Sequence, residues 1–192
     1  MKKLFFACIG LLFVNIANAQ FKATKDGIKT DDGNDFYVVS IDGKSAKELF
    51  DNVESYVISN FKNPDAVLSK QDGKMINIHG IFPSAIPCKK WAGMNYADID
   101  LNLIISFKDS KMKIDAPSIN SMVCRTLKSN SGGYYKYCFY SKEGGFFTGC
   151  YSLFNKKGDV KNKLAVNGIN DFLTHLISEI IDCAKGDSNN DW

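Results

Sequence analysis

Residues 97–107 read ADIDLNLIISF, and this is the most regular stretch of the chain. Every second residue from Ala97 to Phe107 is apolar, and most residues between them are polar. A period of two belongs to a β-strand, in which successive side chains point to opposite faces. The stretch therefore predicts a half-buried strand that places Asp98, Asp100 and Asn102 on its polar face.

The segments on either side predict partners for this strand. After a turn at 108–110, the alternating residues 111–116 predict an antiparallel return strand. Before it, residues 67–70 and 75–82 predict a hairpin about a turn at 71–73, with Asn77 and His79 on one polar face. A loop containing Pro83, Pro87 and Gly93 is expected between the hairpin and residue 97.

Two amphipathic helices are expected near the ends of the folded region. Ser45 and Glu48 have capping-box spacing, and apolar residues follow at helical intervals until Asn63-Pro64. A second apolar stripe runs from Ile169 to Ile181 and predicts a long final helix. A short β-rich run at 36–41 precedes the first helix, and residues 187–192 form a polar tail.

This order of elements predicts the α+β class, as a single domain over residues 36–186. Both apolar helix faces need cover, and one apolar sheet face supplies it, so the helices are expected to pack side by side on an antiparallel sheet. The opposite sheet face is then open and polar. Its expected members are Asn77, His79, Asp98, Asp100, Asn102, Lys113 and Asp115.

An aromatic stretch at 134–140 turns at 143–145 into residues 146–151 and predicts an additional hairpin. About two in three of its rings are assigned to packing and the rest, with Tyr135 and Tyr137 as candidates, to a partner surface. Cys138 and Cys150 flank the turn almost symmetrically, which favours a disulfide between them. The other cysteine pairings stay open.

The N-terminus has the pattern of a secretory signal. Lys2 and Lys3 precede an apolar run, and Ala17-Asn18-Ala19 is a small-residue cleavage site, so residues 1–19 are expected to be removed and the protein exported to the periplasm, the cell surface or the medium. No transmembrane segment is expected. Residues 20–35 are rich in charges and turn formers and are expected to be a flexible leader.

Charge and cysteine patterns exclude several kinds of chemistry. The chain has 24 basic and 21 acidic residues, and loss of Lys2 and Lys3 leaves a net charge of +1. That balance argues against nucleic-acid binding, which needs clustered Lys and Arg. No Cys-x-x-Cys occurs, so zinc and thioredoxin-like sites lack their usual spacing. We expect no cofactor.

Several motifs resemble those of an exported bacterial family, a domain of unknown function with a TATA-binding-protein-like fold. They are residues 42–50 (DGKSAKELF), Asn63-Pro64, the strand into Phe107-Lys108-Asp109, and residues 153–158 (LFNKKG) before the last helix. The resemblance covers roughly residues 36–183. It implies a curved antiparallel sheet backed by two helices, and it brings no catalytic residues and no DNA binding, because a fold alone carries no function.

These observations lead to two functional hypotheses. The first is a monomeric, non-enzymatic binding or assembly module, which meets a protein or small-molecule partner through the open sheet face or the aromatic hairpin. The alternative is a hydrolase-like or metal-dependent enzyme that uses His79 with Asp98 and Asp100. The two differ in geometry, since catalysis requires His79 and a carboxylate within hydrogen-bond reach in a pocket.

Overall fold

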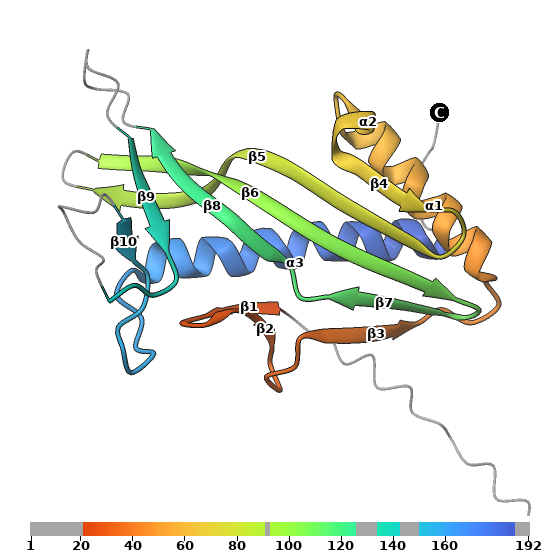
Figure 1. Ribbon diagram of the computed structural model, residues 1–192, viewed down its shortest axis with the longest axis horizontal. Helices are drawn as coiled ribbons and strands as arrows, with labels where there is room; N and C mark the ends of the chain where they lie inside the picture. The colour runs from red at the N-terminus through yellow and green to blue at the C-terminus, as the bar shows by residue number, and fades with distance from the viewer. Residues whose placement is uncertain (1–20, 91–92, 126–133, 143–149, 187–192) are drawn as a thin grey trace, which may run out of the picture.

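The structure is a computed structural model that describes residues 21–90, 93–125, 134–142 and 150–186. Its main sheet has eight strands and is antiparallel at every pairing except one. The principal path through it is β10-β9-β8-β6-β5-β4, and β7 joins β6 to β3. Helices α1 and α3 contact each other, and α3 runs along the length of the sheet (Figure 1). The predicted α+β architecture is confirmed.

The strands and helices have the following bounds: β1 Phe21–Thr24, β2 Gly27–Thr30, β3 Phe36–Ser40, α1 Ala46–Asn60, α2 Pro64–Val67, β4 Leu68–Gln71, β5 Met75–Lys90, β6 Gly93–Lys108, β7 Lys111–Asp115, β8 Ser118–Arg125, β9 Tyr134–Cys138, β10 Cys150–Ser152 and α3 Lys163–Lys185.

Helix α1 begins where the capping box predicts. The Ser45 hydroxyl accepts from the backbone N–H of Glu48, and the Glu48 carboxylate accepts from the backbone N–H of Ser45. Asp109, in the turn before β7, accepts from the backbone N–H of Ala46 at 2.9 Å. These bonds satisfy donors that a helix start leaves without partners and attach the helix to the sheet.

One contiguous core lies between the sheet and the two long helices. The alternating residues of β6 from Ala97 to Ile105 are fully buried, as are Leu49, Val53 and Val57 of α1 and Ile169 of α3. The sheet therefore has one helix-covered face and one face turned away from the helices, which we call the open face.

The prediction of a loop containing Pro83, Pro87 and Gly93 was wrong, because β5 and β6 continue through this segment as a long hairpin. Pairing runs from Met75–Ser106 to Lys90–Gly93 and is interrupted only between Phe82 and Ile86. A bulge there accommodates a residue that cannot donate to the ladder, such as Pro83. Strand β8, which the sequence analysis did not predict, then pairs with β6.

The aromatic segment is not a hairpin. Strand β9 pairs antiparallel with β8 on one side and parallel with β10 on the other, with Lys136 opposite Cys150. A two-stranded hairpin would have to be antiparallel, so the prediction of a second hairpin was wrong. Residues 146–149 of its expected second strand lie outside the described residues.

The prediction that residues 20–35 form a flexible leader was also wrong, because this segment contains the strands β1 and β2. These strands form an antiparallel hairpin that packs against α3 (Figure 1). Phe21 is 2% exposed, and its ring centroid lies 5.1 Å from that of Tyr37. Asn170 of α3 accepts from the backbone N–H of Ala23 at 2.8 Å. Two short strands thus cover a flank of α3 that residues 36–186 alone would leave uncovered.

Candidate functional site

The open face brings three polar side chains from three neighbouring strands into contact. His79 of β5 places Nε2 3.0 Å from Oδ1 of Asp100 on β6. Asn120 of β8 donates from Nδ2 to the same Asp100 oxygen at 3.1 Å. We call His79, Asp100 and Asn120 the sheet-face cluster.

Asn120 reaches this cluster because of a β-bulge in β8. Asp100 is opposite Ser121, and the next residue of β6, Leu101, is opposite Ile119, so Asn120 is the additional residue between them. Bulges redirect side chains in this way, often beside functional sites. The sequence analysis did not identify Asn120, since neither the strand nor the bulge has a clear signal there.

Asp100 is the common acceptor of the cluster. Its Oδ1 accepts from the Asn120 amide and lies within hydrogen-bond distance of His79 Nε2, while Asn120 Nδ2 lies 3.3 Å from that same ring nitrogen. When Nε2 carries its proton and donates to Asp100, it cannot accept from Asn120. The His79 side chain is 56% exposed and that of Asp100 27%. The cluster is therefore a solvated surface site with donors available to a ligand.

Asp98 does not join His79. Its Oδ1 accepts at 2.9 Å from the backbone N–H of Ser84, which lies in the β5 bulge with a φ of 55°. A positive φ is unusual for a residue with a Cβ. Asp98 thus stabilises the bulge, and of the two aspartates in the enzymatic hypothesis only Asp100 contacts His79 among the described residues.

The remaining predicted open-face residues are dispersed. Asn77 lies on β5 opposite Ile104, and its Oδ1 is buried with no hydrogen-bond partner in the described residues. Lys113 and Asp115 of β7 form an ion pair at 2.7 Å, and the Lys113 ammonium lies 5.0 Å from the centroid of the Phe36 ring. These residues are part of the polar open face, but they do not contact the sheet-face cluster.

Large apolar side chains are exposed on the same face beyond the cluster. Ile81, two residues after His79 and opposite Asp100, is 69% exposed. Met94 and Tyr96 of β6 are 58% and 54% exposed, and Tyr134 of β9 is 66% exposed. We call Ile81, Met94, Tyr96 and Tyr134 the apolar end of the open face.

Tyr135 and Tyr137 lie on the opposite, helix-covered side. They are 4% and 8% exposed, and with Tyr151 they form a set of tilted and edge-to-face ring contacts with centroids 5.5 to 6.4 Å apart. Burial raises the pKa of Tyr137 above its ordinary value. These two rings belong to the core, and it is their neighbour Tyr134 that meets solvent.

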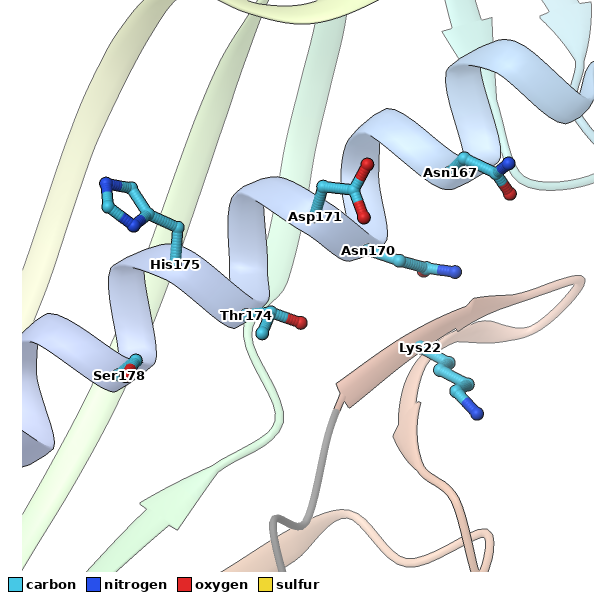
Figure 2. Close-up of a pocket in the computed structure, with 7 residues that line it drawn as sticks. All are labelled: Lys22, Asn167, Asn170, Asp171, Thr174, His175 and Ser178. Atoms are coloured by element: carbon cyan, nitrogen blue, oxygen red, sulfur yellow. The ribbon is translucent and has the colours of Figure 1, made fainter.

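A second, polar surface lies on α3 beside β1. Figure 2 shows Asn167, Asn170, Asp171, Thr174, His175 and Ser178 along the helix, with Lys22 across from them on β1. The groove has a volume of about 580 Å³. Several of its groups are engaged: Lys22 pairs with Asp31 at 2.6 Å, and His175 lies 3.2 Å from Glu179. This groove offers neutral hydrogen-bonding side chains together with the carboxylate of Asp171.

The structure confirms the predicted disulfide between Cys138 and Cys150. Among the described residues, no group of three or more His, Cys, Asp and Glu side chains has the arrangement of a metal site. The described helices also include none that is both long enough and apolar enough to span a bilayer.

Comparisons with known proteins give similarities to solved structures and none to family models or curated proteins. A TBP-like protein from Parabacteroides distasonis is similar in structure, with a TM-score of 0.49 and 13% identity over 78% of this chain and 90% of that one. A DUF4468 family protein from Bacteroides ovatus has a TM-score of 0.45 and 11% identity over 79% of this chain and 84% of that one. Similarity at this level concerns neither ligand nor reaction.

Proposed function

We propose that this protein is an exported binding or assembly module that meets a protein partner through the open sheet face. The observation that carries the proposal is the position of the sheet-face cluster directly beside the exposed apolar end. Ile81 shares a strand with His79 and lies opposite Asp100. Interfaces combine apolar anchors with a few directed polar groups, and this face provides both.

A protein partner fits this surface better than a small molecule. The apolar end extends over β5, β6 and β9, so its anchors are separated by more than the width of one strand. Small-molecule sites instead enclose most of their ligand in a concave pocket. A partner with its own apolar patch, and with an acceptor or carboxylate for Asn120 and His79, would complement the face.

The enzymatic alternative has less support. His79 and Asp100 do meet within hydrogen-bond distance, which is the geometry that this hypothesis requires. However, the exposure of His79 keeps the pair in water, where charge stabilisation is weak. The pair is suited to recognition of a partner surface.

The experiment is a photo-crosslinking comparison in the exporting cell. A photoreactive residue replaces Tyr96, and the chain also carries Ile81→Asp, His79→Ala or Ile58→Asp. Ile58 is 54% exposed on α1 and is the matched control, because it is also an exposed isoleucine but lies away from the open face.

We expect one discrete crosslinked partner with the parent chain and with Ile58→Asp, and loss of that crosslink with Ile81→Asp and His79→Ala. Equal crosslinking in all four chains would reject the proposal. A hydrolytic activity of the purified protein that disappears in His79→Ala and persists in Ile81→Asp would favour the enzyme instead.

A further inference from the structure

Two cysteines from different strands meet inside the core. Cys88 of β5 is opposite Asn95 of β6, and Cys124 of β8 is opposite Ala97 of the same strand. Both side chains point to the helix-covered side and are fully buried. In the structure both are free thiols, and the Cys88 Sγ donates to the Cys124 Sγ at 3.4 Å although the residues are 36 positions apart in the chain.

We propose that Cys88 and Cys124 form a second disulfide in the exported protein, which links β5 to β8 across β6. Exported proteins encounter an oxidising compartment, where adjacent thiols are converted to disulfides. The oxidant is a protein disulfide donor of the thiol-disulfide oxidoreductase class.

The reaction balances as an ordinary thiol-disulfide exchange. One cysteine thiolate attacks the donor disulfide and forms a mixed disulfide, releasing one donor thiolate. The second cysteine thiolate then attacks the sulfur of the first and displaces the other donor thiolate. The pair loses two protons and two electrons, and the donor disulfide gains them and becomes two thiols.

With this bond, two disulfides use four of the five cysteines that follow residue 19. Cys138 and Cys150 are already paired, and Cys88 with Cys124 leaves only Cys183. The Cys183 sulfur donates to the backbone carbonyl of Asn52 at 3.3 Å, which holds it between the two long helices and directs it to α1. The proposal therefore predicts two disulfides between strands and one free thiol, that of Cys183 on α3.

Burial determines when the bond can form. A donor protein cannot reach a fully buried sulfur, and burial together with the neighbouring Cys124 raises the pKa of the Cys88 thiol to about 12. Thiolate is the attacking species, so exchange in the folded chain is slow. The bond therefore closes during folding, before the helices cover β5 and β8, and is afterwards shielded from reductants.

The test is a peptide map of the full chain exported with its own signal. The isolated protein is unfolded in a denaturant that contains a maleimide, which alkylates free thiols as they become exposed, and is then digested with trypsin without reduction. Cys88 lies in the peptide of residues 75–89, Cys124 in that of 114–125 and Cys183 in that of 164–185. The linked peptides of Cys138 and Cys150 report that oxidation has taken place.

We expect peptides 75–89 and 114–125 to elute as one species that separates on reduction, and peptide 164–185 to be alkylated. Alkylation of both strand peptides in protein that carries the Cys138–Cys150 link would overturn the proposal, as would a link from either to Cys183. If the exported protein carries neither disulfide, the reduced chain is refolded with glutathione and glutathione disulfide. Peptides 75–89 and 114–125 that remain unlinked after this refolding would also overturn the proposal.

A stability comparison provides a second readout. The double variant Cys88→Ala with Cys124→Ala should have a lower thermal midpoint than the exported parent while keeping the Cys138–Cys150 link. Cys183→Ser is the matched control and should keep both links. If reduction before refolding lowers the midpoint of the parent no more than that of the double variant, the proposed bond is absent.

Discussion

The Nε2 atom of His79 lies 3.0 Å from Oδ1 of Asp100 on the neighbouring strand, although the two residues are not directly opposite each other. His79 is opposite Asn102, and Asp100 is opposite Ile81, so the contact is diagonal. Diagonal neighbours on one sheet face are within reach of long or aromatic side chains. The open face thus acquires a polar centre that links β5, β6 and β8.

The two aspartates of β6 should separate in mutational tests. Asp100→Ala removes a solvated pair and should change the free energy of unfolding by less than about 1 kcal/mol while abolishing the partner crosslink. Asp98→Ala removes the acceptor of the Ser84 N–H and should cost about 1 kcal/mol. Urea denaturation measures the free energy of unfolding of both variants. A larger loss of stability in Asp100→Ala than in Asp98→Ala would contradict the assignment of Asp98 to the bulge and Asp100 to the solvated cluster.

The N-terminal hairpin should be important for stability. Phe21→Ala removes a buried ring that packs on Tyr37 and should destabilise the protein by about 3 kcal/mol. Lys22→Ala is the control, because the adjacent side chain is half exposed and should change stability by less than about 0.5 kcal/mol. Thermal unfolding of the two variants decides between a packed hairpin and a flexible leader, and equal midpoints would favour the leader.

Gly168 allows α3 to approach the β5 bulge. A Cβ at this position would lie 2.5 Å from Cδ of Pro87 and 3.2 Å from Cγ2 of Ile86. Gly168→Ala should therefore destabilise the protein by about 1 to 3 kcal/mol despite the better helix propensity of alanine. Asn167→Ala, at the exposed neighbouring position, should be neutral or slightly stabilising. A stabilised Gly168→Ala variant in denaturant titration would show that α3 does not pack this closely.

Alkaline pH should weaken the fold through buried tyrosines. Burial, followed by the hydrogen bond to Glu179, raises the pKa of Tyr56 above 10.0, and burial raises that of Tyr37. A phenol with a raised folded-state pKa stays protonated in the folded protein while the unfolded chain already ionises. The stability contribution is thus complete below pH 10 and declines as pH rises above it.

We expect the urea midpoint to fall as the pH rises from about 10 to about 12. It should fall less steeply in Tyr56→Phe, which cannot ionise at this position. Circular dichroism at each pH measures the midpoint. A midpoint that is constant over this range in the parent chain would contradict the prediction.

Elements with strong local signals could be predicted from the sequence. The period of two in residues 97–107 identified the buried and open sides of β6 and, with residues 75–82, placed His79 and Asp100 on one face. The capping box marked the start of α1. These features depend on residues close in sequence, whose preferences the surrounding fold does not override.

Other features had signals that were weak or misleading. The polar segment of β1 and β2 resembles a flexible leader because only Phe21, Ala23 and Ile28 are apolar core residues, and their burial depends on α3, far along the chain. Strand β8 has little alternation around its bulge, so Asn120 was missed. Strand β8 occupies one edge of β9, so β10 pairs with the other edge, where it runs parallel to β9. The local sequence has no signal for this pairing.

The sequence by itself thus determined the α+β class, the sides of the central strands and the first helix start, because periodicity and capping act within a few residues. Only the tertiary structure decided that Asp100 and not Asp98 meets His79, that Tyr135 and Tyr137 are core residues, and that Cys88 meets Cys124 across β6. Each of these contacts depends on strand register and on bulges, which shift side chains by one position and are set by pairing between segments distant in the chain.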